Sequence, residues 1–194
     1  MEGEAETGER LSGVRGRYGL MGLAIASTTN ARDEFRAGPM APSVRRAGVA
    51  DLPALCRLVN RAYEVEAFFV DGDRTGLVEV ARLAEEGQFL VLDGVDGELA
   101  AAVHVRVEDG RGRLSMLSVA PELQGRGLGH RLVAVVEAMS AALGCSVVTL
   151  DVVNLREELG SWYRSLGYRE VGTAPYDHRP PRRACHFVCF EKRI

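Results

Sequence analysis

The sequence lacks any apolar run near the ~20 residues that a membrane-spanning helix needs. Its longest early apolar segment, residues 18–26, is preceded by both acids and arginines and has no clear small-residue cleavage site. A signal peptide is therefore a weak interpretation. We expect a soluble, cytoplasmic protein that has no membrane partner.

An excess of positive charge is also missing. Lysine and arginine together number 24, against 27 aspartate and glutamate residues, which gives a formal net charge of −3. A protein that works by neutralising phosphates along a nucleic acid usually carries a clear basic excess. The composition argues against a nucleic-acid partner and favours a small molecule or another protein.

Cysteine is scarce, and the four cysteines lie in separate contexts. Their positions in apolar patterns indicate reduced residues of the core. A metal-site alternative would combine two cysteines and two histidines near the C-terminus: His178, Cys185, His186 and Cys189. The Cys-x3-Cys spacing inside an apolar run differs from the knuckle spacing of structural zinc sites. We therefore predict no metal site.

Regular patterning is absent from residues 1–42, which are rich in Gly, Ala, Glu and Arg and contain two further methionines, Met21 and Met40. This composition predicts a flexible N-terminal extension, or a start assigned too far upstream. The remaining residues, 43–194, suffice for one sizeable core but are few for two. We expect one domain over residues 43–194.

Within that domain the periodicity predicts strands alternating with helices. Asp51 is expected to cap the first helix, and residues 76–86 form a second. The other predicted elements are strands 43–46, 89–92, 103–108, 114–119, 147–150, 168–173 and 185–191, a helix over 128–143 and a helix opened by Asn154 and closed by Gly167. Strand 114–119, the helix after it and strand 147–150 form a parallel crossover. The sum is a mixed α/β fold with one central sheet.

The most informative segment is the glycine turn between the strand ending at Val119 and the helix starting near Leu128. Its sequence is Pro121-Glu122-Leu123-Gln124-Gly125-Arg126-Gly127-Leu128-Gly129. Glycines here let backbone N–H groups approach an anion closely, and the positive end of the helix dipole adds to the attraction. The turn is neither a Walker loop nor a dinucleotide fingerprint, because the required motifs are missing. A diphosphate would fit, although any tight strand-helix junction needs similar glycines.

This turn resembles that of the GNAT acyltransferases, whose signature Gln/Arg-x-x-Gly-x-Gly/Ala matches Gln124, Gly127 and Gly129. A second segment, residues 162–168 (Trp-Tyr-Arg-Ser-Leu-Gly-Tyr), looks like the family's aromatic-Tyr-x-x-Leu-Gly-aromatic motif. The resemblance covers about residues 44–194. It implies the GNAT fold: a central, mostly antiparallel sheet flanked by helices, containing the parallel crossover and a strand bulge that opens a slot for pantetheine.

The resemblance also implies acetyl-CoA as the acyl donor. The edge of the strand at Leu117, Ser118 and Val119 would then pair with the pantetheine amides. The glycine turn and the start of the next helix would hold the diphosphate, through Gln124, Gly125, Arg126, Gly127, Leu128, Gly129 and His130.

Asn154 is a further candidate for cofactor binding. It lies two residues from the place that the family usually gives to such a contact, which Arg156 occupies. The alternative is structural, because Asn154 and Glu157 have the spacing of a helix N-cap. We favour the cap.

Acylation of an amine by a thioester needs a stabilised carbonyl oxygen and a proton for the departing thiolate. The resemblance implies that the backbone N–H of Val119 serves the carbonyl. It also implies Tyr163 as the acid, a phenol whose unperturbed pKa is ~10. The alternative for Tyr163 is simple packing beside Trp162.

The amine must also lose a proton, and the candidate bases are carboxylates. Asp151 is the leading candidate, because it lies at the C-terminal end of strand 147–150, at the mouth of the expected slot. Glu66 and Glu108 are weaker candidates. A solvated surface carboxylate is the alternative for each of the three.

We predict an N-acetyltransferase that acts on a primary amine, of a small molecule or of a protein, in a ternary complex. The rival is a catalytically silent CoA-binding sensor or interaction module. Residues 63–69 combine aromatics with acids that suit a cationic amine, while Arg179, Arg182 and Arg183 suit an anionic group. The resemblance is compatible with a homodimer.

Overall fold

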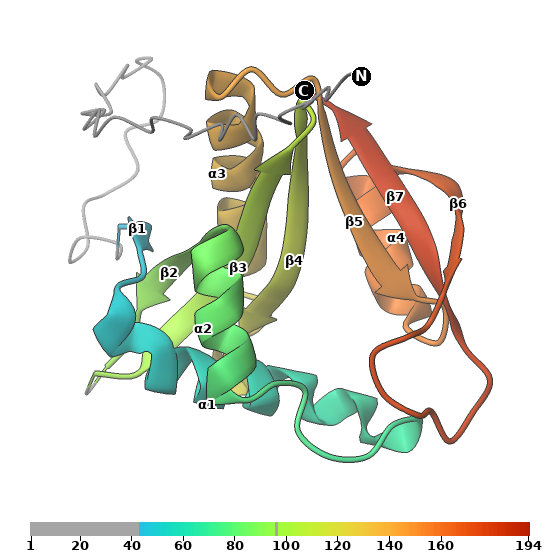
Figure 1. Ribbon diagram of the computed structural model, residues 1–194, viewed down its shortest axis with the longest axis horizontal. Helices are drawn as coiled ribbons and strands as arrows, with labels where there is room; N and C mark the ends of the chain where they lie inside the picture. The colour runs from blue at the N-terminus through green and yellow to red at the C-terminus, as the bar shows by residue number, and fades with distance from the viewer. Residues whose placement is uncertain (1–42, 96) are drawn as a thin grey trace, which may run out of the picture. The chain divides into compact units, whose positions relative to one another are not determined.

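The computed structural model describes residues 43–95 and 97–194 (Figure 1). The extension predicted for residues 1–42 lies outside the described residues. No helix in the described ranges is long and apolar enough to cross a membrane.

Seven strands form one sheet in the order β1-β2-β3-β4-β5-β7-β6. They are β1 (Arg45–Arg46), β2 (Gln88–Asp93), β3 (Leu99–Glu108), β4 (Arg111–Val119), β5 (Val147–Val153), β6 (Arg169–Pro175) and β7 (His186–Arg193). The α-helices are α1 (Leu52–Tyr63), α2 (Leu77–Glu86), α3 (Leu128–Ala142) and α4 (Glu157–Ser165). Neighbouring strands are antiparallel except β4 and β5, which α3 connects as a parallel crossover. The predicted mixed α/β fold is confirmed.

Helices cover both faces of the sheet (Figure 1). Along β2, Phe89 and Val91 pack into the cluster formed with α1 and α2. Leu90 and Leu92 point the other way, into the larger cluster that includes residues of α3 and α4. This alternation follows from the two-residue period of a strand. The centre of the sheet is therefore buried on both sides.

The start of α1 differs from the prediction. Asp51 precedes α1, but its side chain makes no cap hydrogen bond to that helix. Its carboxylate instead accepts hydrogen bonds from the backbone N–H of Gly48, at 2.7 Å, and from the guanidinium of Arg45. Asp51 thus caps the preceding 3-10 turn (Val49–Asp51) and ties it to β1.

The sheet opens between β4 and β5. These strands pair only through Arg111–Arg113 and Val147–Thr149, and they diverge beyond that point. On its other side β4 carries one extra residue against β3, because His104 pairs with Ser115 while Ala102 pairs with Ser118. Met116, inside that interval, has a φ of 53°. This is a β-bulge, which bends a strand, and the bulge that we expected in β4 is confirmed.

Candidate active site

A cavity of about 990 Å³ occupies the opening between β4 and β5. Its walls come from β4, β5, the glycine turn, the first turn of α3, α4, the end of α1 and the β6–β7 loop. The volume is at the upper end of the ~300–1,000 Å³ that is typical of small-molecule sites. One cavity therefore joins the glycine turn to the aromatic residues of α4.

The glycine turn lines this cavity. Gly125 and Gly127 have φ values of 74° and 80°, in the left-handed region that glycine tolerates without strain. Gly127 is the N-cap of α3, and no side chain accepts a hydrogen bond there. The first-turn N–H groups and the positive end of the helix dipole are thus left to attract an anion.

Most of the predicted cofactor residues line the cavity. They are Leu117, Val119, Gln124, Gly125, Gly127, Leu128, Gly129 and His130. Ser118 and Arg126 do not. Ser118 is only 1% exposed, and its hydroxyl donates to the carbonyl of Met116 at 3.1 Å. The bulge at Met116 places Ser118 on the other side of β4.

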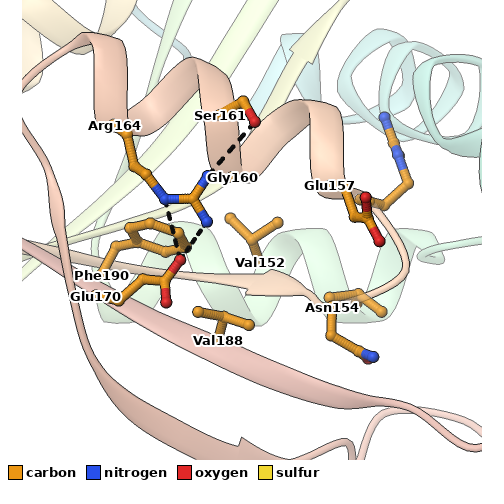
Figure 2. Close-up of a pocket in the computed structure, with 11 residues that line it drawn as sticks. Val152, Asn154, Glu157, Gly160, Ser161, Arg164, Glu170, Val188 and Phe190 are labelled. Carbon is orange, nitrogen blue, oxygen red and sulfur yellow. Dashed lines mark hydrogen bonds and ion pairs between the residues drawn. The ribbon is translucent and has the colours of Figure 1, made fainter.

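Asn154 lies elsewhere, in a second pocket of about 200 Å³ between α4, β5 and β7 (Figure 2). Its backbone N–H donates to the carbonyl of His186, and its side-chain oxygen accepts from the N–H of His186, both at 2.9 Å. The residue at the N-cap of α4 is Arg156. Our interpretation of Asn154 as the helix cap was therefore wrong, because its side chain is hydrogen-bonded to β7 instead of to α4. The large cavity contains Arg156 instead.

The far end of that smaller pocket is closed by an ion pair. Figure 2 shows Arg164 on α4 reaching Glu170 on β6, with Nε 3.1 Å from Oε1. The same guanidinium lies 3.4 Å from the hydroxyl of Ser161. Arg164 and Glu170 thereby link α4 to the edge strand.

Tyr163 is packed and also lines the cavity. It is 5% exposed, and its ring centroid lies 4.8 Å from that of Trp162 and 5.6 Å from that of Tyr168. Burial raises the pKa of Tyr163 well above its ordinary value, with a smaller contribution from Tyr63. The phenol is therefore protonated at neutral pH, as a proton donor must be. The two interpretations of Tyr163 do not exclude each other.

The carboxylates differ in their surroundings. Asp151 on β5 lines the cavity and forms an ion pair with Arg113 where β4 and β5 begin to diverge. Glu66 lies in the 3-10 turn after α1 (Glu64–Phe68), also lines the cavity, and is only 6% exposed. Glu108 is an exposed residue at the end of β3. It forms an ion pair with Arg106 at 2.8 Å and is not part of the cavity wall.

Glu66 has the more perturbed environment. Burial raises the pKa of Glu66, and the nearby positive charges of Arg156, Arg74 and Arg179 oppose the rise. Its Oε1 lies 3.5 Å from a guanidinium nitrogen of Arg156. Sequence reasoning ranked Glu66 below Asp151, since nothing in residues 63–69 indicated that a glutamate would be buried.

The arginines of the β6–β7 loop do not line the cavity. Arg179 donates to the backbone carbonyls of Asp71, Gly72 and Asp73, at 3.0, 2.6 and 2.8 Å. The backbone N–H of Arg182 donates to the carbonyl of Phe69 at 2.7 Å. Arg183 lies outside the wall, with its guanidinium 5.6 Å from the ring of Phe68. Arg179 and Arg182 therefore bind the 67–73 segment, and none of the three arginines belongs to the cavity wall.

Sequence reasoning missed several residues of the wall. These are Arg74, Arg113, Leu159, Tyr176 and His178. None belongs to a recognisable motif, and arginine is so common in this chain that a single one carries little signal. In the described ranges, no group of three or more His, Cys, Asp or Glu residues gathers as a metal site.

Comparisons with known proteins agree with this geometry. The model of the acetyltransferase (GNAT) family matches residues 52–168. No curated protein sequence matches the chain significantly. Solved structures with the same fold include the ribosomal-protein-S18-alanine N-acetyltransferase of Escherichia coli, with 20% identity over 78% of this chain and 93% of the other and a TM-score of 0.64.

Two further structures have the same TM-score. The ribosomal-protein-alanine N-acetyltransferase of Brucella melitensis shows 21% identity over 78% of this chain and 99% of the other, with a TM-score of 0.64. A phosphinothricin acetyltransferase of Sinorhizobium meliloti, determined in complex with AcCoA, shows 16% identity over 80% and 89%, with a TM-score of 0.64. At these identities the structures establish the fold, while the match of the family model extends over more than half of the sequence. The chain belongs to the acetyltransferase (GNAT) family.

Proposed function

We propose that the protein transfers an acetyl group from acetyl-CoA to a primary amine by direct attack in a ternary complex. One observation carries the proposal: a single cavity joins the uncapped N-terminus of α3 to a buried phenol and a buried carboxylate. Anion binding, acid and base are thus available along one continuous space. Each is a requirement of acyl transfer from a CoA thioester.

Gly125, Gly127 and the first turn of α3 would hold the diphosphate of acetyl-CoA. Support comes from their positive φ values and from the absence of a side-chain cap at Gly127. The pantetheine arm would follow the free edge of β4 at Leu117 and Val119, which β5 leaves unpaired beyond Arg113. The backbone N–H of Val119 remains our choice for the thioester oxygen.

In the reaction the amine nitrogen forms a bond to the acetyl carbon and the carbon–sulfur bond breaks. Tyr163 donates its hydroxyl proton to the departing thiolate, and a carboxylate takes the proton that the amine loses. For the base that takes this proton, we prefer Glu66 to Asp151. Support comes from the burial of Glu66 in the wall, whereas Asp151 is engaged by Arg113.

Titration of the purified protein with acetyl-CoA by calorimetry tests the cofactor site. A Cβ atom at Gly129 would lie 3.5 Å from Trp162 and 3.9 Å from Val119, which is ordinary contact, so Gly129→Ala is the matched control. Gly129→Glu brings a carboxylate to the helix N-terminus and should weaken binding roughly tenfold to 100-fold, the range of a lost charge-assisted hydrogen bond. A protein that binds no acetyl-CoA contradicts the proposal.

Release of free thiol in the presence of amines tests the chemistry. Tyr163→Phe keeps the ring in its aromatic cluster but removes the proton donor. We expect turnover to fall by about 10²- to 10⁴-fold, the usual contribution of a general acid, while the dissociation constant of acetyl-CoA stays the same. Unchanged turnover would remove Tyr163 from the mechanism, and binding without any turnover would favour a silent CoA-binding module.

A further inference from the structure

The acceptor end of the cavity contains an arginine that the mechanism above does not use. Arg74 lies just before α2, is half-buried and lines the cavity. Its guanidinium lies over the ring of Tyr63, 5.4 Å from the centroid. A guanidinium on an aromatic face is held by cation–π attraction but keeps its N–H donors at the edge available.

The other two arginines of the cavity wall are already paired. Arg113 is paired with Asp151, and Arg156 lies 3.5 Å from Glu66 and 2.5 Å from Glu158. Asp177 is an acid at the rim, and its oxygen lies 3.7 Å from His178.

Arg74 is different, since it forms no ion pair with any residue in 43–95 or 97–194. Placing a cation in a partly desolvated wall costs free energy unless an anion joins it. A molecule that enters the cavity with a negative charge would therefore give Arg74 an ion-pair partner.

We propose that the acceptor is an amine that also carries a carboxylate, as a free α-amino acid does, and that Arg74 binds this carboxylate while the amine faces Glu66. The inference rests on the proposed function and specifies its substrate class. Arg74 and Glu66 line the same cavity, and Tyr63 stands beside Arg74. A planar guanidinium can hold a carboxylate through two parallel hydrogen bonds, which fixes the orientation of the acceptor as well as its affinity.

The position of Glu66 agrees with this arrangement. Burial raises the pKa of Glu66, and the charges of Arg156 and Arg74 oppose the rise. An incoming carboxylate that neutralises Arg74 would weaken that opposition. Glu66 would then hold a proton more readily when the acceptor is bound, which is the state in which the amine has to give one up.

The test compares matched pairs of acceptors, the common α-amino acids and their α-amides, by thiol release. Each amide keeps the amine and side chain but lacks the carboxylate. Its amine is also the weaker base, with a pKa of ~7.7–8.0 as in a peptide N-terminus, so the comparison is biased against our expectation. We expect at least one acid to have a kcat/KM roughly tenfold or more above that of its amide, the worth of one charge-assisted pair.

Arg74→Gln should reduce that ratio to about one, mainly by raising KM for the acid, and should leave the dissociation constant of acetyl-CoA unchanged. Arg57→Gln is the control, because Arg57 is exposed on α1, pairs with Glu98 and lies outside the cavity. Arg74→Lys should recover part of the preference, since it restores the charge without the planar fork.

Three results would overturn the inference: amides or uncharged amines that react as fast as the acids, an acid preference that survives in Arg74→Gln, or a loss of acetyl-CoA affinity in that variant, which would assign Arg74 to the cofactor. A wild-type protein that acetylates no amine of any class fails the proposed function itself. The two failures are therefore separate.

Discussion

Burial shifts the pKa of Tyr163 and of Glu66 in the same direction, although we propose opposite tasks for the two groups. Both line the cavity, and burial raises the pKa of each group. A phenol with a raised pKa stays protonated, so its hydroxyl can act as a donor to the thiolate but not as a base. A carboxylate with a raised pKa is a stronger base once it is ionised, so its proton affinity comes nearer to that of an amine.

The pH dependence of kcat/KM should identify the base. Activity falls on the acid side as the base becomes protonated, and for Glu66 this fall should lie above the pH at which an ordinary glutamate titrates, 4.5. Glu66→Gln should reduce kcat by about 10²- to 10⁴-fold and abolish the acid limb. Asp151→Asn is the matched change in the other cavity carboxylate. An acid limb that persists in Glu66→Gln and vanishes in Asp151→Asn would restore the original ranking.

At the scale of the elements, α3 packs on β4 through a glycine and a serine. A Cβ atom at Gly112 would lie 2.3 Å from the hydroxyl oxygen of Ser140 and 2.9 Å from its Cβ. Ser140 is fully buried, and its hydroxyl has no hydrogen-bond partner among the described residues. The helix that we propose to bind the diphosphate is thus held against its strand at this point by close approach rather than by a hydrogen bond.

Unfolding in urea should reveal this contact. Gly112→Ala should lower the free energy of unfolding by about 1–3 kcal/mol, the usual cost of overpacking. Ser140→Ala should raise it by up to about 1 kcal/mol, because a buried hydroxyl without a partner is removed. In the double variant the closer clash disappears, so the combined loss should be smaller than the sum of the two single effects. Strictly additive effects would mean that the two residues do not press on each other.

The features that sequence could predict are local ones. The glycine turn needs a left-handed backbone and a helix start within a few consecutive residues, and the sequence displays both. Asn154 shows the opposite case, since its spacing to Glu157 suits a cap but an N–H group 32 residues away takes its side chain. The ion pair of Glu66 is likewise long-range, because its partner Arg156 is 90 residues away. Burial and pairing of this kind arise only after the chain has folded.

At the scale of the whole domain, two loops close the open end of the split sheet. The α1–α2 connection belongs to the half with β1 to β4, and the β6–β7 loop belongs to the other half. They meet at an isolated bridge between Val70 and Pro181. Next to this bridge, Phe69 packs in a small cluster with Val153 and Phe187. Since β4 and β5 pair over a short stretch only, this contact is a second link between the halves, and two of its residues, Val153 and Phe187, also line the cavity.

Arg179 is a polar tie in that link, beside Arg182, because one of its nitrogens donates to the carbonyls of Asp71, Gly72 and Asp73. Arg179→Met should free the 71–73 segment and loosen the site of Arg74 beside it. We expect KM for the acceptor to rise several-fold, the dissociation constant of acetyl-CoA to stay unchanged, and amide hydrogen exchange to increase in residues 67–75.

Arg179→Lys separates the effect of this tie, the three hydrogen bonds of Arg179, from the effect of its positive charge. A lysine ammonium keeps the positive charge near Glu66 but cannot reproduce the rigid geometry of the guanidinium. If the tie positions the acceptor site, this variant should resemble Arg179→Met in both KM and hydrogen exchange. If it behaves like the wild type in both, the charge of Arg179 matters and the tie does not. The two halves of the sheet would then keep the acceptor end closed through the Val70–Pro181 bridge, the contacts of Arg182 with Phe69 and Asp71, and the apolar contacts of Phe69.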